Sequence, residues 1–461
     1  MSVHTKVVKF GGSSLADANQ FRKVADIILS DKARRFVVPS APGKRFKDDT
    51  KVTDMLYACY DIAVKGGNFD DDFQAIKNRY YGIISDLGLE LSLESEFATI
   101  RSCFIGKAGR DYAASRGEYL NGIILAKFLG FNFVDSAEVI FFNDNGQFDG
   151  ERTNDVLSKR LSKLDNAVVP GFYGSMPNDT IKTFSRGGSD VTGSIVARAA
   201  NAEIYENWTD VSGFLICDPR IVENPEPITV ITYRELRELS YMGATVLHED
   251  AIFPVRKAGI PINIKNTNAP DDAGTMIVDS ADSTSCKYTI TGIAGKKGFA
   301  VLNLEKDMMN SEIGFGRKVL EVLEKNGISF EHMPSGIDTM SVIVNCADLE
   351  AKEEAVIAGL KRNVNPDHIE IERDLALIAI VGRGMKSTRG TAGRIFSALA
   401  HKHVNVKMID QGSSELNVIV GVKEDDFCVM LTLAVIFVPP AVVAVNDASS
   451  IVYAGCLNFA V

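Results

Sequence analysis

The sequence has few of the residues that most often serve as catalytic bases, thiol nucleophiles or soft metal ligands. It contains six histidines and seven cysteines among 461 residues. The histidines form no H-E-x-x-H pattern, and the cysteines are scattered, with no C-x-x-C pair and no metal-ligand spacing. Isolated cysteines are typical of reduced thiols, so we expect a cytoplasmic protein. Any catalysis here should not need a histidine, and no metal-ligating residues are predicted.

The sequence also lacks an excess of positive charge and a targeting segment. The formal net charge is −10 and the pI is near 5.3, so no nucleic-acid partner is expected. The N-terminus has no cationic start followed by an apolar run, so no secretion signal is predicted. Residues 428–461 are strongly apolar, but Pro439 and Pro440 interrupt them and no basic flank follows. We therefore expect a buried or sequence-altered tail and no membrane partner.

The common phosphate-binding signatures are missing as well. No G-x-x-x-x-G-K-[ST] motif occurs, and the H-R-D and D-F-G motifs of protein kinases are absent. The stretch GRGMKSTRG (382–390) matches a dinucleotide turn only loosely and lies in a repeated region. The sequence therefore argues against a P-loop enzyme and against a protein kinase.

Up to about residue 283, short β-rich runs alternate with amphipathic helical stretches. The runs are FVVPS (36–40), FNFVDSAEVIF (131–141), NAVVPGFYG (166–174), AEIYENWTDV (202–211) and IPINIKNT (260–267). This alternation predicts an α/β fold, with a mostly parallel sheet covered by helices on both faces. A polar stretch at 279–287 is expected to be a linker.

The C-terminal part of the sequence repeats itself. FAVLNLEKDMM at 299 and ALIAIVGRGMK at 376 lie 77 residues apart, and GRKVLEVLEKNGISF at 316 and GRIFSALAHKHVNVK at 393 share that offset. SVIVN (341–345) and NVIVG (417–421) add a further strand to each copy. We predict two α+β modules of βαββ type, each of about 70 residues. The expected domains are 1–283, 284–427 and a hydrophobic tail, 428–461.

The stretch KFGGSS (9–14) joins a predicted strand to a helical pattern that begins near Leu15. Two glycines allow consecutive backbone N–H groups to face one anion, the helix N-terminus adds partial positive charge, and Lys9 adds a full one. A tight turn beside a surface lysine explains this segment equally well. Both interpretations stay open on this segment alone.

A second glycine pair occurs in FSRGGSDVTGSIVARAANAE (184–203). It follows Arg186 and precedes a predicted helix, with Ser189 and Asp190 as N-cap signals. The guanidinium group of Arg186 suits a carboxylate. A capped helix with an exposed arginine is the alternative.

Two further segments are weaker indications. In SRGEYLNGIILAK (115–127), Glu118 is predicted to start an apolar helix, where the helix dipole alone favours an acid. In WTDVSGFLICDPRIV (208–222), a strand end is followed by Thr209-Asp210 and then by Asp218-Pro219-Arg220. Turn chemistry or a nucleotide-binding loop explains this pattern.

Taken in order, KFGGSS, SRGE, SRGGSD, WTDVSG with DPR, and ATVLHE, followed by the duplicated module, resemble the aspartate kinase family. Members have an amino-acid kinase domain and two C-terminal ACT domains. The resemblance runs from residue 1 to about 427. It implies phosphorylation of the side-chain carboxylate of L-aspartate by Mg²⁺ and ATP, the entry step to lysine, threonine and methionine. A carboxylate is ionised at neutral pH and is its own nucleophile, so no histidine base is needed.

The resemblance also implies roles for single residues. Lys9 and Asp190 would be catalytic, with Asp190 orienting the lysine ammonium group. Glu118 would pair with the α-ammonium group of the substrate, and Arg186 would bind its carboxylate. The other implied substrate-binding residues are Thr53, Gly187, Gly188 and Ser189. The implied ATP-binding residues are Lys9, Phe10, Gly11, Gly12, Ser13, Thr209, Asp210, Leu215, Arg220, Thr245 and Val246. Mg²⁺ would be held mainly through the ATP phosphates.

The sequence departs from the family pattern at four places. Thr245 stands where the family commonly has a lysine on the nucleotide side, and Leu215 stands where a tyrosine often stacks. The loop PSAPGKRFKDD (39–49) is longer than usual, and the residues after Phe427 do not resemble the final elements of an ACT domain. These departures concern ATP affinity and the C-terminus rather than the type of reaction.

The ACT resemblance implies a homodimer or a dimer of dimers, with feedback inhibition by lysine, threonine or both. The candidate effector residues are Gly316, Glu331, Ser335 and Asp338, for which ordinary loop chemistry is the alternative explanation. A non-catalytic amino-acid sensor with the same fold is the alternative function. The intact Lys9, Glu118, Arg186 and Asp190 argue against it. The duplicated module argues against glutamate 5-kinase and uridylate kinase.

Overall fold

The computed structural model describes residues 4–185, 187–222, 225–243, 247, 252–281, 288–411, 416–429 and 433. Its contacts divide the chain into two compact units. The first unit comprises Met1–Phe214, Pro227–Tyr233 and Thr245–Ala281, and the second comprises Leu215–Glu226, Arg234–Ala244 and Asp282–Val461. Two segments of the predicted 1–283 domain thus group with the C-terminal unit, and the expected domain boundaries stay a prediction.

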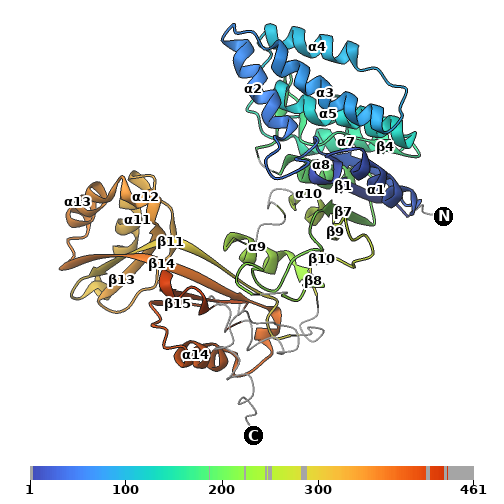
Figure 1. The fold of residues 1–461 in the computed structure, drawn as a ribbon. Coiled ribbons are helices and arrows are strands. Elements are labelled where there is room, and N and C mark those ends of the chain that lie inside the picture. Colours follow the sequence, from blue (N-terminus) through green and yellow to red (C-terminus); the bar gives the residue numbers. More distant parts are fainter. Residues whose placement is uncertain are drawn as a thin grey trace. The chain divides into compact units, whose positions relative to one another are not determined.

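The first unit is built on a sheet with the strand order β3-β4-β2-β1-β7-β9-β10-β8 (Figure 1). Neighbouring strands are parallel, except that β10 is antiparallel to β9. The strands are β1 (Lys6–Phe10), β2 (Arg34–Pro39), β3 (Asn132–Phe133), β4 (Ala167–Val168), β7 (Ile204–Thr209), β8 (Val230–Thr232), β9 (Ile262–Asn266) and β10 (Thr275–Val278). A separate hairpin consists of β5 (Tyr173–Ser175) and β6 (Ile181–Thr183).

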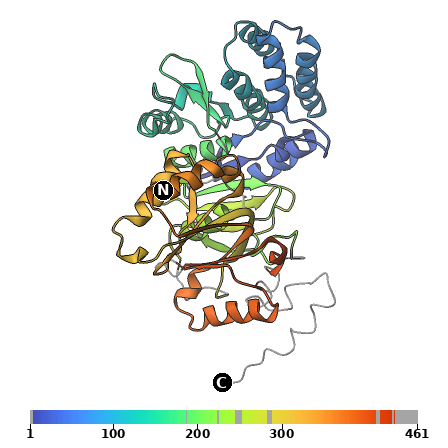
Figure 2. The same cartoon turned by 90° about the vertical axis from the view of Figure 1, so that its left-hand side faces the viewer.

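Helices cover both faces of this sheet, as expected. They are α1 (Ala18–Leu29), α2 (Val52–Val64), α3 (Asp70–Asp86), α4 (Glu94–Ile105), α5 (Arg110–Leu129), α6 (Ser136–Val139), α7 (Gly150–Leu161), α8 (Gly188–Ala199) and α10 (Phe253–Lys257). Helices α2 to α5 gather in one group (Figures 1 and 2). Val8 and Phe10 of β1 join their core. Because successive side chains of a strand alternate between faces, Lys9 points the other way, where α8 packs on β1.

Three local expectations were wrong. The stretch 131–141 contains the two-residue β3 and then turns into α6. Glu118 lies in the middle of α5, because this helix is buried on most of its surface and its start cannot be read from an apolar stripe. The N-cap of α8 is Gly187, whose φ of 54° favours glycine, so Ser189 and Asp190 lie in the first helical turn.

The second unit contains an antiparallel sheet with the order β12-β13-β11-β14-β16-β15. Its strands are β11 (Gly292–Glu305), β12 (Phe330–His332), β13 (Thr339–Asn345), β14 (His368–Val381), β15 (Met408–Asp410) and β16 (Asn417–Lys423). Its helices are α11 (Phe315–Lys325), α12 (Cys346–Glu350), α13 (Glu353–Asn363) and α14 (Thr391–His401). The helix α9 (Tyr233–Tyr241) begins in the first unit and continues in the second.

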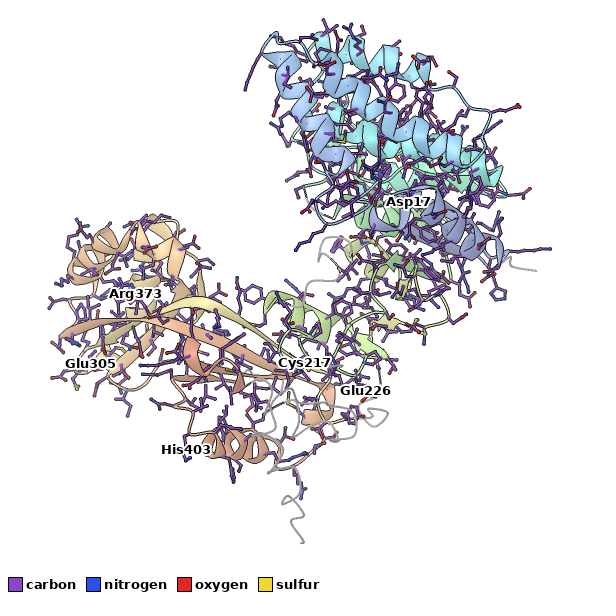
Figure 3. All side chains as sticks on the ribbon, viewed as in Figure 1. Asp17, Cys217, Glu226, Glu305, Arg373 and His403 are labelled. Atoms are coloured by element: carbon purple, nitrogen blue, oxygen red, sulfur yellow. The ribbon has the colours of Figure 1, made fainter. Side chains whose placement is uncertain are left out.

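The expected repeat is visible in the order of these elements. β11, α11, β12 and β13 follow one another as β14, α14, β15 and β16 do. β11 and β14 each have 14 residues and pair along their length, so the two modules share them. Figure 3 labels Glu305, where β11 ends, and Arg373 on the neighbouring β14.

Most of the predicted linker and nearly all of the apolar tail lie outside the described residues. Residues 282–287, 430–432 and 434–461 belong to this part of the chain. In the part that the structure describes, no helix combines the length and the apolar character that a membrane span requires.

Candidate active site

The carboxyl ends of four adjacent parallel strands meet at one edge of the first sheet. β4, β2, β1 and β7 end there at Val168, Pro39, Phe10 and Thr209. Ligands of open α/β sheets bind outside this edge. The loops that follow these strands therefore form the candidate site.

Lys9 lies at the centre of this edge. Its side chain is 9% exposed, and its Nζ atom lies 2.5 Å from Oδ1 of Asp190. Asp190 sits in the first turn of α8, where the helix dipole stabilises a carboxylate. The structure thus brings together the two residues predicted to be catalytic.

The glycine turn after β1 offers backbone donors, but they are shifted by one residue from the expected glycine pair. The N–H group of Gly11 donates to the carbonyl oxygen of Trp208 at 3.0 Å and is not free for a ligand. Among the described residues, the N–H groups of Gly12 and Ser13 find no protein acceptor. An anion beside Lys9 would therefore meet Gly12 and Ser13.

The loop after β2 packs directly on this turn. The N–H group of Gly43 donates to the carbonyl oxygen of Gly12 at 2.8 Å. A Cβ atom on Gly43 would lie 2.5 Å from the carbonyl carbon of Gly12, and one on Gly12 would lie 2.9 Å from the carbonyl oxygen of Ala41. Only glycine permits this approach of the two backbones. The sequence analysis missed Gly43, although a glycine four residues beyond the end of β2 was visible.

Arg79 of α3 holds the loop between β2 and α2. Its NH2 atom donates to the carbonyl oxygens of Gly43 at 2.6 Å and Ala16 at 3.2 Å, and its NH1 atom lies 2.7 Å from Oδ2 of Asp49. Asp49 also accepts a hydrogen bond from the guanidinium group of Arg45. Arg45 and then Arg79 hold the pKa of Asp49 far below its usual value. No sequence motif indicated Arg79.

Glu118 lies deep in the unit, with 6% of its surface exposed. Its Oε2 atom has no hydrogen-bond partner among the described residues. Burial raises the pKa of Glu118 to about 8, although the backbone N–H of Ala41 and the charges of Arg116 and Lys9 act in the opposite direction. Such a carboxyl group is ready to receive a cation.

Thr53 lies on α2, close to Gly117, the residue that precedes Glu118 on α5. It is the second residue of α2, and its Oγ1 atom lies 3.8 Å from the position of a Cβ atom on Gly117. The structure therefore brings Thr53 close to the helix of Glu118, and its contact with the substrate stays a prediction.

The start of α8 is fixed against the loop that follows β4. A Cβ atom on Gly188 would lie 2.4 Å from Cδ2 of Phe172, and one on Gly171 would lie 2.5 Å from Oγ of Ser189. Phe172 has a φ of 82°, a left-handed conformation that is uncommon for a bulky residue and is often found at functional sites. The sequence analysis missed both Gly171 and Phe172.

The structure describes four of the six remaining residues predicted to bind the nucleotide. Thr209 is the last residue of β7 and Asp210 follows it, and the hydroxyl group of Thr209 donates to Oδ1 of Asp210 at 3.1 Å. Leu215 and Arg220 belong to the second unit, so their nucleotide role stays a prediction. The side chain of Arg220 is 86% exposed and pairs with Asp218 at 2.5 Å. The predicted site residues Arg186, Thr245 and Val246 lie outside the described residues.

Three of the candidate effector residues surround one loop of the second unit. A Cβ atom on Gly316 would lie 3.5 Å from Cε of Met340, and Ser335 forms a β-bridge with Met340. Asp338 lies between Ser335 and Met340 in the sequence. Its Oδ1 atom accepts a hydrogen bond from the N–H group of Met308 at 3.0 Å. The structure thus groups Gly316, Ser335 and Asp338.

The fourth candidate, Glu331, already has a partner in the same unit. It lies on β12, and its carboxylate accepts a hydrogen bond from the hydroxyl group of Tyr241 at the end of α9. Its predicted role as the ligand of an effector ammonium group stays a prediction.

Comparisons with known proteins fit this architecture. Residues 4–266 match the amino acid kinase family, and residues 378–428 match an ACT domain. Aspartokinase 3 of Bacillus subtilis is 40% identical over 435 residues, which cover 91% of this chain and 95% of the relative. The chain belongs to the aspartokinases. It is therefore a kinase with a carboxyl group as acceptor, as predicted.

Two solved aspartokinase structures agree with the model. The aspartate kinase of Clostridium acetobutylicum is 52% identical, with a TM-score of 0.86, over 94% of this chain and 99% of that one. Escherichia coli aspartokinase III, solved with aspartate and ADP, is 25% identical with a TM-score of 0.72, again over 94% and 99% of the two chains. The predicted family and fold class are confirmed.

Proposed function

We propose that this aspartokinase transfers the γ-phosphoryl group of ATP to L-aspartate at the carboxyl ends of β1, β2, β4 and β7. The observation that carries the proposal is the position of Lys9, which pairs with Asp190 and is adjacent to the N–H groups of Gly12 and Ser13, for which the described residues offer no acceptor. An ammonium group and converging backbone donors are the groups that bind a polyphosphate. The E. coli relative solved with aspartate and ADP supports this assignment.

The donor set at the turn after β1 fits ATP. Lys9, Gly12 and Ser13 would hold the phosphates, and Thr209 and Asp210 lie at the end of the neighbouring strand β7. In the described part of the chain, no group of three or more histidine, cysteine, aspartate or glutamate side chains could hold a metal ion. Mg²⁺ would therefore arrive with ATP, held by its phosphates, and neutralise part of their charge.

The substrate would occupy the space between α5, α2 and the start of α8. The Oε2 atom of Glu118, which has no partner in the described part of the chain, would receive the α-ammonium group, and this contact would offset the cost of burying an ionised carboxylate. Arg186 would bind the α-carboxylate, while Thr53 and Ser189 would contribute hydroxyl groups. This arrangement leaves the side-chain carboxylate directed toward Lys9.

The reaction needs no general base. One oxygen of the substrate's ionised side-chain carboxylate attacks the γ-phosphorus atom, and the bond from this phosphorus to the oxygen that bridges to ADP breaks. The products are 4-phospho-L-aspartate and ADP, with no proton transferred. Lys9 stabilises the charge on the transferred group, and the rest of the rate enhancement comes from positioning.

The second unit would regulate this reaction through its ACT modules. We propose that lysine, threonine or both bind there, and that the chain forms a homodimer or a dimer of dimers in the cytoplasm. Ile313 is 97% exposed, and Met308 and Ile337 are also strongly exposed, all near the candidate effector loop. Apolar side chains gathered on a surface are typical of an interface. Light scattering should give a mass of at least twice the 50.1 kDa of one chain.

Trapping of the acyl phosphate with hydroxylamine tests the proposed function. ATP turnover would be measured with L-aspartate, with L-glutamate and without an acceptor, each with and without lysine and threonine. We expect hydroxamate to form with aspartate but not with glutamate or without an acceptor. Lys9→Ala should form no hydroxamate. Amino-acid binding without hydroxamate from any acceptor would instead favour the sensor.

A further inference from the structure

Asn207 lies beside the proposed catalytic pair and has no role so far. It is on β7, opposite Lys9 in the register of β1 and β7, and 3% of its surface is exposed. Its Nδ2 atom donates to Oδ1 of Asp190 at 2.9 Å, and its Oδ1 atom faces Nζ of Lys9 at 3.5 Å. Together with the contact of Lys9 and Asp190, these bonds close a triangle.

The chemistry of the three side chains permits one orientation of the amide. A lysine ammonium group can only donate, and an ionised carboxylate can only accept. Asn207 must therefore turn its oxygen to Lys9 and its nitrogen to Asp190. The neutral amide of Asn207 bonds to the cation and to the anion at once. It therefore fixes the positions of both side chains without adding a charge to the site.

We propose that Asn207 is a positioning residue for phosphoryl transfer, which holds Asp190 and Lys9 so that the ammonium group keeps a free N–H for the phosphate. The lysine has three N–H bonds: one goes to Asp190 and one toward Asn207, which leaves one for a ligand. Without the amide, Asp190 loses one of its hydrogen-bond donors. The flexible side chain of Lys9 would then turn more of its N–H bonds toward Asp190 and away from the phosphate. The inference rests on the proposed function of this site.

A charged isostere separates positioning from a merely structural role. In Asn207→Asp, two carboxylates compete for Lys9, and repulsion raises the pKa of one of them. Protonation of that carboxyl group restores a donor and an acceptor, much like the amide. The other titratable group that faces Asp190 from β7 is Tyr205, whose hydroxyl group donates to the backbone oxygen of Asp190. Burial raises the pKa of Tyr205 well above its usual value, so Tyr205 stays neutral. On β9, the neighbour of Asn207 is the uncharged Ile264.

The experiment compares Asn207→Ala and Asn207→Asp with the control Asn263→Ala. Asn263 lies in the same sheet on β9, opposite Glu206. Steady-state kinetics would be measured at pH 6 and pH 8, with thermal unfolding as a check on folding. The single tryptophan, Trp208, stacks on Phe10 and would report ATP binding by fluorescence.

We expect kcat to fall by about 10- to 100-fold in both Asn207 variants at pH 8, with a smaller change in the KM for ATP. In Asn207→Asp, the loss relative to wild type should shrink by at least about threefold at pH 6. Asn263→Ala should keep wild-type kinetics. Wild-type kinetics in Asn207→Ala, or an equal loss at both pH values in a folded Asn207→Asp, would overturn the inference.

The same variants, together with Lys9→Ala, distinguish a wrong role for Asn207 from a wrong assignment of the whole site. If Lys9→Ala is inactive while both Asn207 variants work normally, the site stands and the role of Asn207 falls. If Lys9→Ala remains active, the proposed site itself is wrong.

Discussion

Glu118 illustrates how a single side chain is prepared for its ligand. It is buried, one of its oxygens has no partner among the described residues, and its pKa is raised to about 8 because burial penalises the ionised form. A carboxyl group in this state is largely protonated at neutral pH. The arriving α-ammonium group of aspartate makes ionisation favourable, so binding and proton release are linked.

The first prediction is that the KM for aspartate falls as the pH rises from about 6.5 to about 8.5, by up to tenfold per pH unit. The sign follows because the proton on Glu118 must leave before the ion pair forms, and the pKa of Glu118 in the complex is lower than in the free enzyme. Initial-rate kinetics across this range measure the slope. Glu118→Gln should raise the KM by at least about tenfold and remove the slope. An unchanged slope in Glu118→Gln would show that another group titrates.

At the scale of elements, the loop between β2 and α2 depends on a residue of α3. Arg79 donates to two backbone carbonyl oxygens and to Asp49, and it thereby fixes the loop against the glycine turn after β1. This fixation keeps the loop packed on the turn at Gly12.

The second prediction concerns this arginine. Arg79→Met should lower the free energy of unfolding by about 3 kcal/mol, because it removes the buried donor of two carbonyl oxygens and one of the two arginines that pair with Asp49. It should also raise the KM for both substrates, since the loop leads into Thr53 and supports Gly12. Denaturant unfolding and steady-state kinetics measure the two effects. Arg45→Ala is the matched control, because Arg45 binds the same Asp49 but its side chain is 45% exposed. Equal effects of the two variants would contradict the assignment.

At the scale of the whole molecule, α9 connects the two units by covalent continuity. It begins at Tyr233 in the first unit, and from Arg234 onward it belongs to the second. There the buried Glu235 accepts hydrogen bonds from Thr291 at 2.5 Å and from the backbone of Arg383 at 2.9 Å. At its end, Tyr241 donates to Glu331. The helix is thus firmly attached to the regulatory sheet.

The third prediction is that Tyr241→Phe lowers the concentration of effector needed for half-inhibition, by about two- to tenfold, with kcat unchanged. If Glu331 binds an effector ammonium group as predicted, the hydroxyl group of Tyr241 would compete with it, so removal of this hydroxyl group should favour the effector. Inhibition curves for lysine and threonine provide the measurement, and Glu331→Gln should shift the same curves in the opposite direction. Identical curves for wild type and both variants would exclude Glu331 from the effector site.

The sequence was sufficient for the family, the fold class and the pairing of Lys9 with Asp190. The order of several short motifs is specific even though each is weak alone. Residues that act through tertiary contacts could not be predicted from the sequence. Asn207 and Arg79 carry no motif, because their roles depend on register and on helix packing. The N–H groups of Gly12 and Ser13, which lack an acceptor among the residues described, could not be singled out either, since the N–H group of Gly11 donates to the carbonyl oxygen of Trp208 on another strand.

The long strands β11 and β14 make the two regulatory modules inseparable as parts. β13 pairs with the second half of β11, and β16 pairs with the second half of β14, while β11 and β14 pair with each other. Excision of either module would remove the pairing partner of the long strand in the other module. The remaining long strand would then become a bare sheet edge. For anyone who recombines such enzymes, the exchangeable cassette is therefore the whole pair, and a crossover point placed between the modules would yield two incomplete halves.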